Sequence, residues 1–453
     1  MSTAETSKNT GQVSFSEAFL VWLKIGLLSF GGPAGQIALM HRILVDEKKW
    51  IDENRFLHAL NYCMLLPGPE AQQLTVYVGW LLHGIRGGLV AGILFVLPGA
   101  IVIMVLSALY AGYGELTVVQ SIFFGVKAAV LAVVIGAVRK LGSKVLKNGT
   151  MLSFAVLSFI GIFFLGLPFP VIVITAAVVG FFGGMYRPAS FAILSGHATD
   201  DDDDQAATPH HQSASTSRAM KTIVVCLALW LGPIAALAYL LGGSSVFTQE
   251  AMFFSKMAVV TFGGAYAVLA YMAQAAVETY GWLLPGEMLD GLGMAETTPG
   301  PLIMVTQFVG FLGAFRNPGG LDPMLAGVLG ASLTVWVTFV PCFLWIFLGA
   351  PYVERLRENV RLSSALSAVT AAVVGVILNL AVWFGLNVVF GKVEKIDYHG
   401  LVLFNPDLAT LDPAALVLCI LACIMMFFMR FGMMAILASC AVLGFVYHML
   451  PIS

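Results

Sequence analysis

The stretch Leu66-Pro67-Gly68-Pro69-Glu70 places a proline–glycine–proline sequence inside an otherwise apolar part of the chain. Proline and glycine interrupt helices, because proline lacks a backbone donor and glycine is conformationally free. A matching sequence, Thr298-Pro299-Gly300-Pro301, follows at a separation of 232 residues, counted from Pro67 to Pro299. The same separation relates Ser29-Phe30-Gly31-Gly32 to Thr261-Phe262-Gly263-Gly264, Lys24 to Lys256 and Trp50 to Trp282. These matched positions indicate an internal duplication in which each copy has two helix breaks.

The composition is that of a membrane protein with several spans. Of the 453 residues 59% are hydrophobic and 11% are charged, whereas soluble domains have about 25% charged residues. The net charge of −2 gives no argument for nucleic-acid binding. Six cysteines lie in apolar segments without metal-type spacing, and no nucleotide-binding loop or other catalytic motif occurs. We therefore expect no metal site, no cofactor and no enzymatic activity.

A spanning helix requires about 20 apolar residues, and several segments meet this requirement. After an N-terminal tail at 1–14, the first repeat is expected at 15–186 and the second at 250–450. Residues 187–221 contain five consecutive aspartates and are predicted to be a disordered acidic linker. Residues 222–242 are predicted to be an extra transmembrane helix. Simple spans are expected at 89–112, 116–138, 151–166, 169–186, 323–350, 363–388, 413–429 and 431–448.

The segments that open the first repeat, 16–45 and 56–83, are each cut by a break. Both are either broken spanning helices or re-entrant hairpins. Lys and Arg favour short cytoplasmic loops, and four of them (Arg42, Lys48, Lys49 and Arg55) lie between the two segments. Hairpins place this group inside, and the matching loop at 274–286 has no Lys or Arg, as an outside loop should. The charge distribution therefore favours hairpins, with the N-terminus and the linker cytoplasmic and the C-terminus outside.

An odd number of membrane crossings separates the two repeats under either reading, so the copies enter from opposite sides. The predicted fold is an all-α polytopic membrane protein with two homologous inverted-topology repeats, whose broken or re-entrant helices meet near the bilayer midplane. This is the architecture of many secondary transporters, with a substrate site at the broken helices.

The breaks predict an anion site. Helix N-termini present unpaired N–H donors and a positive dipole end, and Lys24, Lys256 and Lys127 add positive charge. The alternative for Lys24 and Lys256 is that they extend to the lipid headgroups. The predicted substrate-binding residues are Lys24, Ser29, Gly31, Gly32, Pro67, Gly68, Pro69, Gln73, Lys127, Lys256, Gly263, Gly264, Thr298, Pro299, Gly300 and Pro301.

Two carboxylates flank the breaks, Glu70 directly after the first and Glu296 before the second. They are not at equivalent positions of the two copies. Buried carboxyl groups near a lysine are able to exchange protons near neutral pH, so we predict a proton-coupling role for both. A structural ion pair or helix capping is the alternative.

Phe30-Gly31-Gly32 with Leu66-Pro67-Gly68-Pro69-Glu70-Ala71, and Thr261-Phe262-Gly263-Gly264 with Ala295-Glu296-Thr297-Thr298-Pro299-Gly300-Pro301, resemble the chromate ion transporter (CHR) family in its long, two-domain form. Gly125-Val126-Lys127-Ala128-Ala129 is also similar to that family's pattern. The acidic linker is not expected of the family.

The resemblance implies proton-driven export of chromate, a tetrahedral dianion, and chromate resistance in a bacterium, from its inner membrane. Protons are the implied coupling ion, and the oligomeric state stays open, with a homodimer as one possibility. A carrier of sulfate or another oxyanion, or a passive anion channel, would use the same donors. A membrane-embedded reductase is disfavoured because no cofactor motif occurs.

Overall fold

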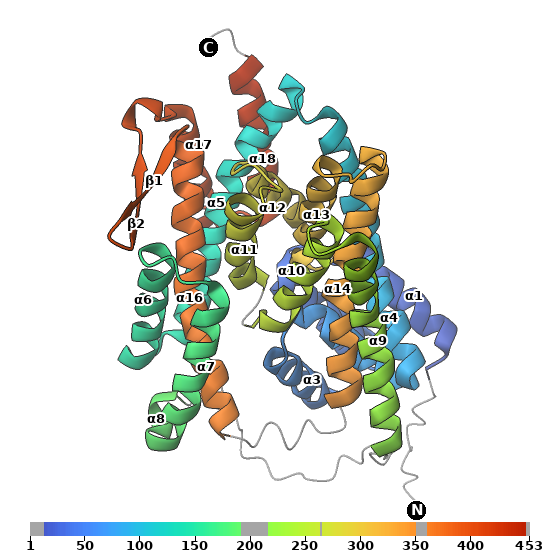
Figure 1. Cartoon of the computed structure of the whole chain (residues 1–453). Coiled ribbons are helices and arrows are strands. Elements are labelled where there is room, and N and C mark those ends of the chain that lie inside the picture. Colours follow the sequence, from blue (N-terminus) through green and yellow to red (C-terminus); the bar gives the residue numbers. More distant parts are fainter. Residues whose placement is uncertain (1–12, 192–215, 263–264, 350–359, 450–453) are drawn as a thin grey trace, which may run out of the picture.

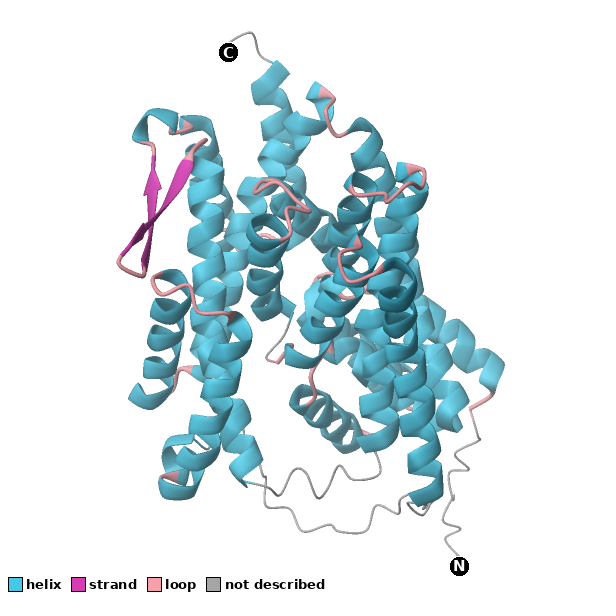
Figure 2. Ribbon diagram, in the orientation of Figure 1, coloured by secondary structure: helices cyan, strands magenta, loops and turns pink. Residues whose placement is uncertain are grey.

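The computed structural model describes residues 13–191, 216–262, 265–349 and 360–449, and these residues are almost entirely helical (Figures 1 and 2). In this part of the chain, six helices are long and apolar enough to cross a membrane. They are α4 (Glu70–Tyr113), α5 (Thr117–Val145), α7 (Phe169–Tyr186), α9 (Thr216–Leu241), α14 (Pro323–Gly349) and α16 (Val360–Val389). Shorter apolar helices are α6 (Gly149–Phe163), α17 (Pro413–Phe427) and α18 (Met433–Met449). The predicted all-α polytopic membrane fold is confirmed.

The first copy opens with short helices separated by the predicted breaks. They are α1 (Phe15–Leu28), α2 (Gly32–His41), the π-helix η1 (Arg42–Glu47) and α3 (Glu53–Leu65), and α4 follows. The 13 residues of α3 extend over about 20 Å at 1.5 Å per residue, which is too short for a membrane core of about 30 Å. Gly31 and Gly68 have φ of +86° and +119°, which glycine adopts without the steric cost that a Cβ brings.

The second copy repeats this order of elements. It contains α10 (Val246–Val260), α11 (Ala265–Gln274), the π-helix η2 (Ala275–Thr279), α12 (Glu287–Thr297), the 3₁₀ turn η3 (Leu302–Met304) and α13 (Val305–Arg316). Gly300 has φ of +96°, in the same left-handed region as its equivalent Gly68. Gly263 and Gly264 lie outside the described residues. A π-helix follows the second short helix in both copies, so the copies share even this irregularity.

The opening segments of the first copy double back as hairpins. Lys48 after η1 forms an ion pair of 2.7 Å with Glu17 at the start of α1. His83, where α4 has non-helical φ and ψ, lies 2.8 Å from the carbonyl oxygen of Val13 through Nε2. The start of α1, the end of η1 and the kink of α4 therefore lie at one end of the molecule, with the breaks away from it. This is the hairpin arrangement that the charge distribution favours.

The second copy folds in the same way. Glu287 at the start of α12 pairs with Arg316 at the end of α13 at 2.6 Å. The ring of Trp282 stacks on Phe254 at 6.0 Å, and the equivalent rings Trp50 and Trp22 lie 6.5 Å apart. In Figure 1, α1 and α3 lie in the lower half of the view, whereas α12 and α13 lie in the upper half.

Each copy's long helix packs on the break of the other copy. In α4, a Cβ at Gly99 would lie 2.3 Å from the carbonyl oxygen of Pro299. In α14, the thiol of Cys342 would lie 3.0 Å from a Cβ at Gly68. Gly99 and Cys342 each follow a proline within their helix, Pro98 and Pro341. The long helices therefore approach the breaks at small residues.

The remaining elements surround this centre. α5 lies against α18, and α16 lies against α6 and α7 (Figure 1). Strands β1 (Val393–Tyr398) and β2 (Leu401–Pro406) form an antiparallel hairpin. The N–H of Val402 in β2 donates at 2.7 Å to the carbonyl oxygen of Phe164, which lies in the turn between α6 and α7. Two short helices, α8 (Pro188–Phe191) and η5 (Leu408–Thr410), complete the order. Residues 192–215, most of the predicted linker, lie outside the described part.

The hairpins give a labelling pattern that spanning helices would not give. Ser16→Cys and Lys48→Cys should react with a membrane-impermeant thiol reagent from the same side of the membrane, because Lys48 pairs with Glu17. Thr279→Cys, at the end of η2, should react from the opposite side. The native cysteines are buried or half-buried, so the unsubstituted protein gives the background. Labelling of positions 16 and 48 from opposite sides would contradict the hairpin.

Gly99→Ala should destabilise the protein, because the added methyl group would meet the carbonyl oxygen of Pro299. Overpacking of this kind costs about 1–3 kcal/mol, which should lower the melting temperature of the purified protein. Gly112→Ala is the matched control on the same helix, since nothing lies within 4 Å of its added Cβ. Equal melting temperatures for the two variants would show that α4 does not need close contact with the break.

Candidate functional site

The two proline–glycine–proline breaks bind the glycine-rich breaks of the opposite copy. Gly68 N–H donates to the carbonyl oxygen of Thr261 at 2.8 Å, and Gly300 N–H donates to that of Ser29 at 2.9 Å. Gly68 and Gly300 are equivalent positions, as are Ser29 and Thr261. The two hydrogen bonds are therefore reciprocal, and they bring all four breaks to one place, which we call the crossing.

Side chains complete the hydrogen bonding at the crossing. Ser29 Oγ donates to Ile25 O at 2.6 Å, and Thr261 Oγ1 donates to Met257 O at 2.6 Å, again at equivalent positions. Gln36 Nε2 donates to Gly300 O at 2.6 Å, so one amide of the first copy holds the break of the second. These bonds satisfy backbone groups that a broken helix exposes.

Two glutamines in the first turn of α4, Gln72 and Gln73, retain unused polar atoms. Both polar side-chain atoms of Gln72 are buried without a hydrogen-bond partner among the described residues, and so is Oε1 of Gln73. Gln73 Nε2 donates to Pro67 O at 2.7 Å. An unpartnered buried amide costs about 1–3 kcal/mol, so water or a polar solute is expected beside it. Gln72 thus has one donor and one acceptor unused, and Gln73 has one acceptor unused.

Most of the predicted site residues lie at the crossing. Those brought together there, as parts of the breaks or directly beside them, are Ser29, Gly31, Gly32, Pro67, Gly68, Pro69, Gln73, Thr298, Pro299, Gly300 and Pro301. Gly263 and Gly264 lie outside the described residues, so their predicted roles stay predictions.

Lys24 and Lys256 are not brought to the crossing. Lys24 is exposed and shares a face of α1 with the exposed Leu20 and Leu28. Lys256 is exposed on α10 beside Met252 and Val259, which are also exposed. This position fits the alternative in which a lysine extends from an apolar helix face toward lipid headgroups. An anion-binding role for the two lysines stays a prediction.

The two predicted proton-coupling carboxylates have different surroundings. Glu70 is the first residue of α4 and is half-buried. Glu296 on α12 is buried and accepts a hydrogen bond of 2.5 Å from the hydroxyl of Tyr266 on α11. Its second oxygen has no partner in the part of the chain that the structure describes. Glu296 therefore has an acceptor atom available within the second hairpin.

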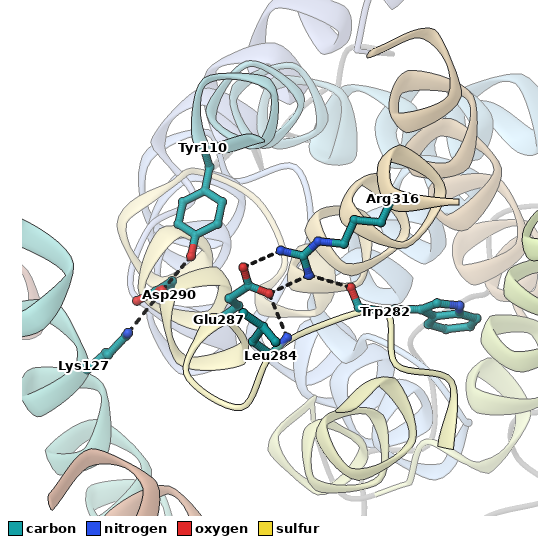
Figure 3. Close-up of polar contacts among 7 residues, drawn as sticks. All are labelled: Tyr110, Lys127, Trp282, Leu284, Glu287, Asp290 and Arg316. Atoms are coloured by element: carbon teal, nitrogen blue, oxygen red, sulfur yellow. Dashed lines mark hydrogen bonds and ion pairs between the residues drawn. The ribbon is translucent and has the colours of Figure 1, made fainter. Parts of the chain in front are cut away.

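Lys127, the third predicted cation, forms a buried ion pair that links α5 to the second copy. Its Nζ lies 3.4 Å from Asp290 Oδ2 on α12, and the hydroxyl of Tyr110 on α4 donates to the same oxygen at 2.8 Å (Figure 3). The side chain of Lys127 is 29% exposed, whereas that of Asp290 is 4% exposed. The lysine thus keeps access to solvent while the aspartate is enclosed.

A second ionic pair stands one helical turn from Asp290. Arg316 donates to both carboxylate oxygens of Glu287, at 2.7 and 2.6 Å, and to the carbonyl oxygen of Trp282 at 2.9 Å (Figure 3). Bidentate arginine–carboxylate bonds are strong and fix geometry. This pair closes the outer end of the second hairpin.

A cavity of about 270 Å³ opens beside Lys127. At about 30 Å³ per water molecule it has room for several waters or a small hydrated ion. The charged residues in the lining of this cavity are Lys127 and Asp412, and Asp412 caps the N-terminus of α17. Its lining is Phe124, Lys127, Asn387, Val388, Phe390, Gly391, Thr410 and Asp412.

Comparison with known proteins adds to this geometry. A family model described as chromate transporter matches residues 16–181 and 248–445, which is most of the chain and includes both pairs of breaks. The chain belongs to the chromate transporter family. Its relatives in the family include a chromate transport protein of Pseudomonas aeruginosa, 33% identical over 81% of this chain and 80% of the relative. Another, from Cupriavidus metallidurans, is 27% identical over 95% of this chain and 92% of the relative. No solved structure matches.

The two regions that match the chromate transporter family also contain polar residues that the sequence alone did not single out. Asp290, Gln36 and Tyr266 lie in apolar helices, and each meets a partner from another element. The one available signal for Asp290 was Lys127, a cation in a spanning helix that requires a counter-charge.

Replacing Lys127 and replacing Asp290, the two partners of the ion pair, should lower the stability of the protein by unequal amounts. Lys127→Met leaves an enclosed carboxylate without its cation, and breaking a buried pair in this way costs about 3–5 kcal/mol. Asp290→Asn should cost less, because Lys127 is partly exposed. Melting temperatures should rank wild type, Asp290→Asn and Lys127→Met in falling order. The double variant should be more stable than Lys127→Met, and a double variant that is less stable would contradict the pairing.

Proposed function

We propose that this protein is a secondary transporter that exports chromate across the bacterial inner membrane in exchange for protons and thereby confers chromate resistance. Membership of the chromate transporter family supports chromate as the substrate. The observation that carries a transport mechanism is the crossing, where Gly68 N–H binds Thr261 O and Gly300 N–H binds Ser29 O. Short helices that end inside a membrane protein are tolerated where they are buried or line a cavity.

The crossing supports alternating access by inverted repeats. The hairpins of the two copies lie toward opposite ends of the molecule and meet at their breaks (Figure 1). Because the contacts are reciprocal, tilting either hairpin pair about the crossing opens one end while the other end stays closed. In this proposal the N-terminus and the 187–221 linker are cytoplasmic, the C-terminus is outside, and residues 222–242 invert the second copy.

The chemistry of the site supports an oxyanion as the cargo. The amide N–H of Gln72 has no partner in the described structure and is a donor that suits the oxygens of a tetrahedral anion, and the N–H groups of Gly68 and Gly300 become donors to it when the hairpins separate. Lys127 supplies positive charge beside a cavity. Glu296, with its bond to Tyr266, and Glu70 are the proposed proton-exchanging groups near the breaks.

A carrier of sulfate or another oxyanion is the second candidate. It is favoured by the neutrality of the donors at the crossing, since amide and backbone N–H groups do not distinguish one tetrahedral dianion from another. A passive anion channel would require an open path, and the reciprocal hydrogen bonds close the crossing in this conformation.

Chromate uptake into inverted membrane vesicles tests the proposal. A proton gradient, acidic inside, should drive accumulation, and excess sulfate should inhibit it only in part. Uptake abolished by sulfate would indicate a general oxyanion carrier, and uptake indifferent to the gradient would indicate a channel. A variant with Lys127→Met and Asp290→Asn together should raise the Kd for chromate about tenfold, or about 1.4 kcal/mol. Lys140→Met, an exposed position on the same helix, should leave the Kd unchanged.

A further inference from the structure

Glu250 on α10 is a buried acidic residue outside the sites described above. It is 0% exposed, and neither carboxyl oxygen has a hydrogen-bond partner among the described residues. It lies between three helices, α10, α13 and α14, which pack on one another. No ion pair within the described part of the chain includes it.

Two glycines make the space that the carboxyl group occupies. A Cβ at Gly313 of α13 would lie 2.6 Å from Glu250 Oε1, and a Cβ at Gly330 of α14 would lie 2.8 Å from Oε2. The ring of Trp282 borders the same place, at 3.0 Å from the Gly313 position. One turn along α14, the hydroxyl of Thr334 is also buried without a partner in the described structure. Larger residues at either glycine would displace the carboxyl group.

The charged and titratable groups on the surrounding helices are engaged elsewhere or distant along their helices. Arg316 on α13 is held by Glu287 and Trp282 O. On α14 the titratable side chain is Cys342, three turns beyond Gly330. Lys256, further along α10, is exposed. The remaining such groups with a described side chain are Tyr266 and Tyr271 on α11 and Lys221, Cys226 and Tyr239 on α9, and none of them is hydrogen-bonded to Glu250 in the described structure.

An isolated carboxylate in such surroundings is stable only as its neutral acid, because burying an unpaired charge is far more costly than burying a neutral group. The adjacent atoms at Gly313, Gly330 and Trp282 are mostly carbon, whereas metal cations of the sodium or calcium type require several oxygen ligands. The enclosure therefore suits a proton rather than a metal ion.

We propose that Glu250 is a proton-binding site whose loading and release are coupled to the crossing, an inference that rests on the proposed proton exchange. α10 leads to Thr261, which accepts the hydrogen bond of Gly68. α13 begins after the Pro299–Pro301 break, which holds Ser29 through Gly300. Release of the proton requires water at the carboxyl group, and water enters only if α10 separates from α13 and α14. That separation moves the two breaks of the second copy relative to each other.

Transport assays in reconstituted vesicles containing the full chain distinguish a loss of chromate transport from a loss of coupling to protons. Two rates are measured with chromate as the probe, accumulation driven by a pH gradient and chromate–chromate exchange at equal pH on both sides. Glu250→Gln keeps the shape and neutrality of the protonated acid. It should retain exchange within about twofold and lose gradient-driven accumulation by about tenfold or more, as expected for an ionisable coupling group. Glu115→Gln, at an exposed position, is the control and should keep both rates.

Gradient-driven accumulation by Glu250→Gln equal to that of wild type would overturn the inference. If Glu250→Gln loses both rates, Glu250→Asp decides, because it keeps a titratable group. Accumulation retained by Glu250→Asp supports proton binding, and its loss identifies Glu250 as a packing residue and overturns the inference. Dependence of accumulation on a sodium gradient that Glu250→Gln removes would also overturn it. Wild-type protein that never responds to a pH gradient would instead refute the proton coupling of the proposed function itself.

Discussion

The pair of hydrogen bonds from Gly68 N–H to Thr261 O and from Gly300 N–H to Ser29 O is the contact on which the rest of the structure depends. A helix that breaks inside a membrane exposes backbone groups that lipid cannot satisfy. Here each break satisfies a group of the other copy, so neither hairpin is complete alone. Gly68 and Gly300, the two donors, both have a positive φ, which glycine adopts without steric cost. Each copy thus completes the hydrogen bonding of the other at the centre.

Close packing around the crossing follows from the same constraint. Small residues at positions 99 and 342 fit this packing, because a Cβ added at Gly99 would meet the carbonyl oxygen of Pro299 and one added at Gly68 would meet the thiol of Cys342. Gln36 then uses its amide on Gly300 O, and Gln73 uses its amide on Pro67 O. The polar atoms of Gln72 and Oε1 of Gln73 remain without a partner in the described structure. In the proposed function, the access of a solute to these atoms depends on the tilt of the two hairpins.

The sequence predicted the positions of the breaks and six of the spans, at 89–112, 116–138, 169–186, 222–242, 323–350 and 363–388, because these depend on local composition and repeat register. The segments expected to span at 151–166, 413–429 and 431–448 are shorter apolar helices in the structure. The sequence also indicates, from the charge of short loops, on which side of the membrane each hairpin lies, and this stays a prediction. It did not predict which residues meet across the repeats. Gln36 and Gly300 are 264 positions apart, and nothing local to either indicates the other. Matched register did not indicate that Lys24 and Lys256 lie on exposed faces away from the crossing, since register does not say which face of a helix a residue occupies. Helical spacing from Lys24 to Leu20 and Leu28 indicates an apolar outer face, which the structure has.

The two copies are alike in backbone and unlike in chemistry. Glu250, Asp290 and Glu296 of the second copy stand where the first has Ala18, His58 and Met64. All three carboxyl groups are buried, whereas the first hairpins pack an apolar core around Trp22, Phe56 and Tyr62. Two copies with the same backbone fold are expected to give two hairpin tilts of comparable energy in the proposed transporter. Backbone symmetry alone does not make either tilt depend on the binding of a proton. In the proposed function, the buried acids that the second copy has and the first lacks at the equivalent positions break that equivalence, because protonation then stabilises one tilt of the hairpins over the other. For a transporter of the proposed kind, the symmetric backbone provides the two states and the unequal side chains provide the coupling.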